Sequence, residues 1–198
     1  MRPGSPSAGR RGGVGWFGTG YAGLAGFLAV EALVRPPGAA SDLHASTEDA
    51  GSTRGIAAAS ALAALCAPFL RRLPLRPLPA AGAPLGVLAL AAGLALRVWS
   101  MRTLSESYSR TLRVTDEQRV AEHGPYRLVR HPGYLGSLLV WAGFALTSGS
   151  PAVVATVAAL VTPPYVHRID AEERLLDREL PGYQAYRGRT ARLVPRVW

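Results

Sequence analysis

The chain has 198 residues, of which 48% are hydrophobic, and it carries a formal net charge of +9. That charge could suit nucleic acid, but every cationic side chain is an arginine and the arginines flank long apolar blocks, a distribution typical of membrane proteins. We therefore expect no nucleic-acid partner. The single cysteine, Cys66, excludes an intrachain disulfide and a cysteine metal site, and no other metal-binding set is apparent.

Five apolar blocks predict five membrane-spanning helices. The first and third approach the roughly 20 residues that cross a hydrocarbon core of roughly 30 Å, and the other three are shorter. Each block alone would also suit a buried helix of a soluble bundle, but five in so short a chain favour a membrane. We predict an all-α integral membrane bundle of about five transmembrane helices with a cytoplasmic C-terminal helical tail. The blocks are Val14–Val34, Gly55–Leu70, Ala80–Trp99, Gly133–Ser148 and Pro151–Val166.

The N-terminal half predicts little chemistry. Residues 1–13 are rich in Gly, Pro, Ser and Arg, and we expect a disordered arm rather than a cleavable signal peptide. Residues 14–101 hold the first three transmembrane helices, whose many small residues allow close helix packing in lipid. The catalytic region is therefore expected in residues 102–198, which comprise a cytoplasmic connection, a transmembrane hairpin over 133–166 and the tail.

The polar residues of this region gather in two segments, Arg102–His131 and His167–Trp198. The sequence "TSGS" between the last two blocks predicts a tight turn, which returns the chain to the side where the hairpin began. The two segments should therefore meet at one membrane face. The two segments carry six and seven arginines, so the positive-inside rule predicts that this face is cytoplasmic. Six other arginines, in the N-terminal arm and in "RRLPLR", would then lie on the opposite face of the membrane.

The segment "HGPYRLVRHPGYLG" places a polar cluster at the start of the fourth block. Gly124-Pro125 is a turn signal, and Pro132 suits the first turn of a helix. The helix start leaves backbone N–H groups that can hold an anionic group. The side chains of Tyr126, His131 and Tyr134 add aromatic faces and hydrogen-bonding groups. An interfacial belt of aromatic and arginine side chains is the alternative, but it explains His131-Pro132 less well.

In the tail, Asp170–Leu180 is predicted to be helical, with an apolar stripe at helical spacing. Glu172 and Glu173 flank that stripe, and carboxylates near a membrane are costly unless they have partners. The alternative is an amphipathic surface helix held by ion pairs such as Asp170–Arg174.

Together, "GPYRLVRHPGYLG", the hairpin and "RIDAEERLL…YQAYRGRTARLVPRVW" resemble the isoprenylcysteine carboxyl methyltransferase family and its bacterial and archaeal relatives. These are integral membrane enzymes that use S-adenosylmethionine, and the resemblance covers about residues 105–198. It implies a methyltransferase that acts on a lipophilic acceptor such as a carboxylate. The implied location is a bacterial inner membrane, with the lipid bilayer as partner and the active site facing the cytoplasm.

The family pattern is G-x-Y, H-P-x-Y-x-G and, after the hairpin, E-E-x-x-L. Carried over position by position, it implies cofactor binding by Gln118, Arg119, Val120, Ala121, Tyr126, His131, Pro132, Gly133, Tyr134 and Glu172. Arg168 is implied to orient the acceptor. Gln118 departs from the pattern, because relatives often have His there, and the tail is about one residue shorter before Tyr183.

Two other functions fit the sequence. One is an NADPH-dependent membrane reductase of the sterol or steroid type, since some of these enzymes share a related helical architecture. The other is a non-enzymatic membrane scaffold that retains the motifs as relics.

Overall fold

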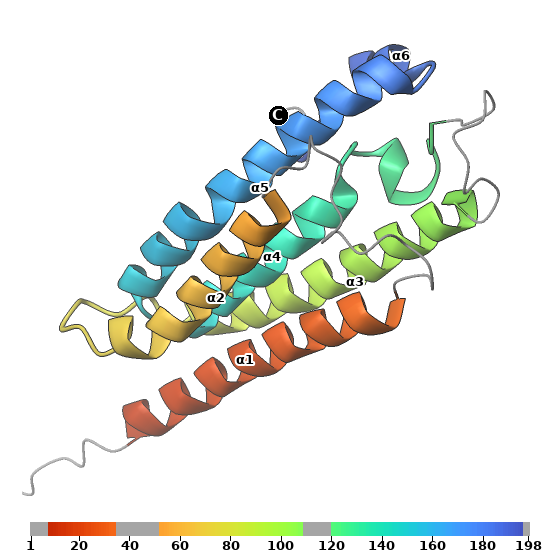
Figure 1. Ribbon diagram of the computed structural model, residues 1–198. Coiled ribbons are helices and arrows are strands. Elements are labelled where there is room, and N and C mark those ends of the chain that lie inside the picture. The colour runs from red at the N-terminus through yellow and green to blue at the C-terminus, as the bar shows by residue number, and fades with distance from the viewer. Residues whose placement is uncertain (1–7, 35–51, 109–119, 196–198) are drawn as a thin grey trace, which may run out of the picture.

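The computed structural model describes residues 8–34, 52–108 and 120–195, and within these ranges the chain forms a bundle of helices without strands (Figure 1). The predicted all-helical bundle is therefore confirmed. The long helices lie alongside one another, and the short elements gather at one end. The elements are α1 (Ala8–Val34), α2 (Ser52–Leu70), α3 (Gly82–Tyr108), a 3₁₀ helix η3 (Gly124–Arg127), α4 (Pro132–Thr147), α5 (Pro151–Glu179) and α6 (Tyr183–Arg189).

Among the described residues, three helices are long and apolar enough to cross a membrane: Thr53–Leu70, Gly82–Leu104 and Pro151–Glu179. α4 is also apolar but has only 16 residues. Large apolar side chains such as Leu65 on α2 point outward, as contact with lipid requires. The chain is thus an integral membrane bundle, as predicted. α1 begins at Ala8, inside the expected N-terminal arm.

α3 and α4 run antiparallel and touch through two pairs of glycines. A Cβ atom on Gly93 would lie 2.6 Å from the carbonyl oxygen of Gly136, and one on Gly136 would lie 2.8 Å from that of Gly93. Gly86 and Gly143 form the same reciprocal contact, at 2.8 and 2.5 Å. Only glycine fits at such distances, so the two backbones pack directly against each other, as small residues permit in lipid.

α5 is one continuous helix of 29 residues, although the sequence predicted one helix ending at Val166 and another starting at Asp170. The chain stays helical through Pro163 and Pro164. Prolines are tolerated in membrane helices where neighbouring elements compensate for the lost backbone hydrogen bonds, and α5 packs along α2 (Figure 1). The helix therefore runs without a break from the membrane core to the end of the bundle, where it presents the carboxylates that the sequence placed in the tail.

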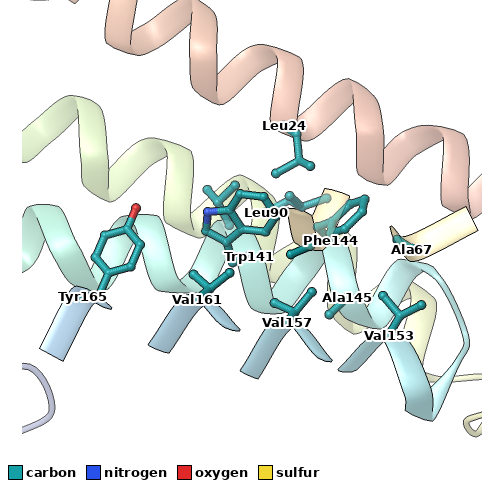
Figure 2. Packing of buried hydrophobic residues seen from close by; sticks show 12 residues of the cluster. Leu24, Ala67, Leu90, Trp141, Phe144, Ala145, Val153, Val157, Val161 and Tyr165 are labelled. Carbon is teal, nitrogen blue, oxygen red and sulfur yellow. The ribbon is translucent and has the colours of Figure 1, made fainter. Parts of the chain in front are cut away.

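The buried core lies between the long helices, and α4 is at its centre (Figure 2). Phe144 is fully buried, and its ring meets those of Tyr21 and Trp141 edge to face, with centroids 5.0 and 5.8 Å apart. The Tyr21 hydroxyl donates a 2.7 Å hydrogen bond to the Ala64 carbonyl, which joins α1 to α2. This core holds α1 and α2 against the α3–α4 pair.

The two ends of the bundle differ. At one end, the Leu78 N–H donates to the Gly149 carbonyl at 3.0 Å, so the connection after α2 lies beside the α4–α5 turn. At the other end, the Arg130 N–H donates to the Ala191 carbonyl at 2.8 Å. The segment before α4 and the tail therefore meet, as the hairpin argument predicted.

Candidate functional site

A cavity of about 720 Å³ lies at the end of the bundle where the tail meets the start of α4. Its volume is within the range of pockets for small molecules. The part lined by η3, α4, α5 and α6, called the polar half, carries most of the polar and aromatic side chains. The part lined by α1 and α2, called the apolar half, is mostly apolar but includes Glu31 and Thr53. Of the predicted site residues, those that line it are Val120, Ala121, Tyr126, His131, Gly133, Tyr134, Arg168 and Glu172.

Pro132, also predicted, is fully buried at the start of α4 and does not line the cavity. Gln118 and Arg119 lie outside the described residues.

Tyr134, on α4, connects this helix to α5 in the polar half of the cavity. Its hydroxyl donates a 2.6 Å hydrogen bond to Oε2 of Glu172 and accepts one of 3.2 Å from Nε of Arg168. Nη1 of Arg168 also reaches Oγ1 of Thr53 on α2, at 3.4 Å. The Tyr134 hydroxyl is therefore bonded to both Arg168 and Glu172, and α2, α4 and α5 together hold these side chains in place.

Glu173, to which the sequence assigned no role, is the most heavily bonded carboxylate of the site. Its side chain is 4% exposed and accepts hydrogen bonds from Nε of Arg130 at 2.8 Å and from Nε2 of His131 at 3.1 Å. Arg192 donates two more, from Nε at 3.0 Å and from Nη2 at 2.6 Å. Glu173 is thus the counter-charge for two arginines and ties the start of α4 and the tail to α5.

His131 lines the cavity but is largely buried, and its ring is held within this network. Its Nε2 is directed at Glu173, and its ring lies 5.8 Å from that of Tyr134, centroid to centroid. Its backbone N–H donates to the Arg192 carbonyl at 3.2 Å. Within the first turn of α4, the N–H groups of Gly133 and Tyr134 are those that have no acceptor inside the helix.

The tail closes the cavity with two tyrosines. The Tyr186 hydroxyl donates a 2.6 Å hydrogen bond to the Tyr126 carbonyl. The Tyr183 hydroxyl is buried and has no hydrogen-bond partner among the described residues. Burial raises the pKa of Tyr183 to about 12, and the negative charge of Glu173 acts in the same direction. Tyr183 therefore remains a neutral phenol over the physiological pH range.

Two carboxylates of α5 that could have formed ion pairs within the helix pair instead with arginines that follow α5 in the sequence. Asp170 pairs with Arg192 at 2.9 Å, and Asp177 pairs with Arg187. These contacts fix the tail over the cavity.

A second charged pair lines the cavity on its apolar side. Nε and Nη2 of Arg97, on α3, bond to Oε1 and Oε2 of Glu31, on α1, at 2.6 and 3.1 Å. Their side chains are 20% and 18% exposed. Sequence reasoning missed this pair, although a single charge inside an apolar block was a signal for it.

No cluster of three His, Cys, Asp or Glu side chains that could hold a metal ion occurs in the described ranges. Among the described residues, the polar half instead offers the carboxylate of Glu172, together with tyrosine faces and the first turn of α4. Such groups can hold an organic molecule that carries both positive and negative charge.

Comparisons with known proteins agree with the sequence pattern. Residues 82–181 match the family model for phospholipid methyltransferase. This range begins with α3 and ends just after α5, so it contains Tyr134, Arg168 and Glu172.

Two curated proteins are similar to part of the chain. The "Cobalt-zinc-cadmium resistance protein CzcN" of Cupriavidus metallidurans is 33% identical over 113 residues, which are 57% of this chain and 49% of that protein. The "Protein-S-isoprenylcysteine O-methyltransferase A" of Arabidopsis thaliana is 27% identical over 95 residues, 47% of this chain and 48% of that protein. The chain thus spans about half the length of these relatives. No solved structure matches it significantly.

Proposed function

The chain belongs to the phospholipid methyltransferase family, and on that basis we propose that it transfers a methyl group from S-adenosylmethionine to a lipophilic acceptor at a membrane. The observation that carries this proposal is the group formed by Tyr134, Arg168 and Glu172 in a cavity that is polar at one side and apolar at the other. The resemblance to isoprenylcysteine carboxyl methyltransferases favours an acceptor oxygen, such as that of a carboxylate.

The polar half of the cavity fits S-adenosylmethionine, which has a cationic sulfonium, a zwitterionic amino acid end, a ribose and an adenine. Glu172 faces the cavity and can accept hydrogen bonds from the cofactor, whereas neighbouring Glu173 is already saturated by its partners. The N–H groups at the start of α4 suit a carboxylate. The faces of Tyr126 and Tyr134 favour a cation.

When bound, S-adenosylmethionine supplies an electrophilic methyl group, whose transfer to an acceptor oxygen breaks the bond to sulfur and leaves S-adenosylhomocysteine. A carboxylate acceptor is already a nucleophile and needs no general base. A mechanism without a general base agrees with the position of His131, whose Nε2 is bonded to Glu173. Arg168 can hold an anionic acceptor by charge-assisted hydrogen bonds, and holding it in place supplies much of the catalysis.

The apolar half of the cavity suits the chain of a lipid-like acceptor, because α1 and α2 line it with side chains such as Phe27 and Ile56. The thirteen arginines of the connection and tail favour a cytoplasmic position for the site by the positive-inside rule, and we propose a bacterial inner membrane as its location.

Calorimetry with S-adenosylhomocysteine on the purified full chain tests the cofactor, with NADPH as the matched alternative ligand. We expect S-adenosylhomocysteine to bind and NADPH not to bind. NADPH binding alone would instead favour the membrane reductase. Methyl transfer from labelled S-adenosylmethionine into a membrane extract then identifies the acceptor class. Cofactor binding without transfer to any component of a broad lipid panel would favour a scaffold.

A further inference from the structure

The pair formed by Glu31 and Arg97 has no part in the chemistry described above. Arg97 lies within the candidate span Gly82–Leu104, and both side chains line the cavity. Charged side chains within membrane spans are rare and commonly mark functional sites. A largely buried ion pair also adds little stability compared with apolar side chains of similar volume, so packing alone does not account for it.

The geometry of Arg97 leaves it able to bind a further group. The pair with Glu31 uses Nε and one N–H of Nη2, and a guanidinium has five N–H groups in all. Nη1 points to the start of α4, because a Cβ atom on Gly133 would lie only 2.8 Å from it. Gly133 itself lines the cavity. The glycine thus leaves room for the guanidinium where the apolar half of the cavity meets the polar half.

The surroundings of Arg97 favour an anion. Gly133 and Tyr134 begin α4, whose N-terminal end carries the positive pole of the helix dipole. The cavity lining carries three arginines, Arg97, Arg130 and Arg168, against two glutamates, Glu31 and Glu172. Beyond Arg97, the cavity is lined by apolar side chains such as those of Leu24 and Trp141. A molecule that fits both regions has an anionic head and an apolar chain.

We propose that Arg97, oriented by Glu31, is a specificity-determining residue that binds the anionic head of the methyl acceptor, a carboxylate or a phosphate. The assignment of this ligand as the acceptor rests on the proposed function. The binding of an anionic amphiphile does not, and it can be measured without turnover. Glu31 orients the guanidinium through Nε and Nη2, and its negative charge competes with that of the ligand.

Binding is measured on the full chain in nanodiscs of neutral phosphatidylcholine, with the fluorescence of Trp141 as reporter and a Trp141→Phe variant to isolate its signal. The probes share one alkyl chain and differ in the head: dodecanoate, dodecyl phosphate, dodecanol and dodecylamine. We expect dodecanoate, dodecyl phosphate or both to bind more tightly than dodecanol, by roughly tenfold or more, since charge-assisted hydrogen bonds distinguish them. The anion that binds identifies a carboxylate or a phosphate head.

The two partners of the pair should give opposite results. Arg97→Gln should abolish the preference for an anion, whereas Glu31→Gln should retain or increase it, because the guanidinium loses its competitor. Arg97→Lys, which keeps the charge, should retain part of the preference. Arg102→Gln is the matched control, since Arg102 is exposed on the same helix and does not line the cavity.

A merely structural ion pair predicts that Arg97→Gln and Glu31→Gln behave alike, and that result would overturn the proposal. Equal binding of dodecanol and the anions, or tightest binding of dodecylamine, would overturn it too. S-adenosylhomocysteine binding, measured on the same samples, reports on the proposed function separately. Its absence in the unmodified chain would refute the methyltransferase assignment while leaving the anion preference as measured.

Discussion

Glu172 and Glu173 are adjacent in the sequence but occupy opposite environments. Glu172 lines the cavity and accepts a 2.6 Å hydrogen bond from Tyr134. Glu173 points away into a network with Arg130, His131 and Arg192. One residue along a helix turns the side chain by about 100°, which follows from 3.6 residues per turn. The two carboxylates should therefore respond differently to the same substitution.

Glu173→Gln should destabilise the protein. The substitution removes the carboxylate that pairs with Arg130 and leaves Arg192 with Asp170 alone, and breaking a buried ion pair typically costs about 3–5 kcal/mol of the free energy of unfolding. Thermal unfolding in detergent, followed by helical circular dichroism, measures the loss. Glu172→Gln is the matched control and should keep a Tm near that of the unmodified chain. Equal Tm values for the two variants would contradict the structural role of Glu173.

Arg168→Lys and Glu172→Gln should separate acceptor from cofactor. Arg168→Lys keeps the charge but loses the planar guanidinium, so it should impair use of the acceptor with S-adenosylhomocysteine affinity nearly intact. Glu172→Gln removes the carboxylate that faces the cavity and should weaken S-adenosylhomocysteine binding roughly tenfold, as loss of a charged hydrogen-bond partner does. Calorimetry on both variants measures this. Equal loss of cofactor binding in both would refute the division of roles.

Gly93→Ala and Gly136→Ala should each disrupt the contact between α3 and α4. The added methyl group would lie within 3 Å of a backbone carbonyl on the opposite helix, at 2.6 and 2.8 Å, and neither backbone can yield without separating the helices. Overpacking of this kind costs about 1–3 kcal/mol or more. Gly18→Ala is the control, because a Cβ atom there meets nothing within 4 Å. A Tm for Gly93→Ala as high as that of Gly18→Ala would contradict direct backbone packing.

Accessibility tags should report two faces of the membrane. A tag at Trp198 and one inserted between Arg110 and Arg119 should lie on the same face, because the α4–α5 hairpin returns the chain. A tag at Leu75 should lie on the opposite face, since the neighbouring Leu78 bonds to Gly149 in the hairpin turn. Labelling with a membrane-impermeant reagent in right-side-out vesicles measures this. Opposite faces for the first two tags would mean that α4 and α5 do not both cross.

The sequence predicted the bundle and the meeting of connection and tail, because both follow from apolar block length and one turn signal. It did not predict that α5 continues through Pro163 and Pro164, since the packing of α5 along α2 is a tertiary contact. The pair of Glu31 and Arg97 joins residues on different helices, and no local spacing relates them.

The assignment of the two glutamates shows the same limit. Helical periodicity placed Glu172 and Glu173 on either side of one stripe. Glu173 turns from the cavity because Arg130 and Arg192 pair with it. These arginines belong to segments before α4 and after α6, so no local pattern on α5 predicts their position.

The shortness of α4 bears on how deeply the cavity lies. Sixteen residues rise about 24 Å, whereas a bilayer has a hydrocarbon thickness of about 30 Å. Because α4 lies at the centre of the bundle, its first turn lies below the ends of the longer helices that surround it. Tyr134, in the first turn of α4, therefore lies close to the depth at which acyl chains begin. An amphiphile whose head lies beside Tyr134 keeps its chain in the hydrocarbon and need not be extracted into water.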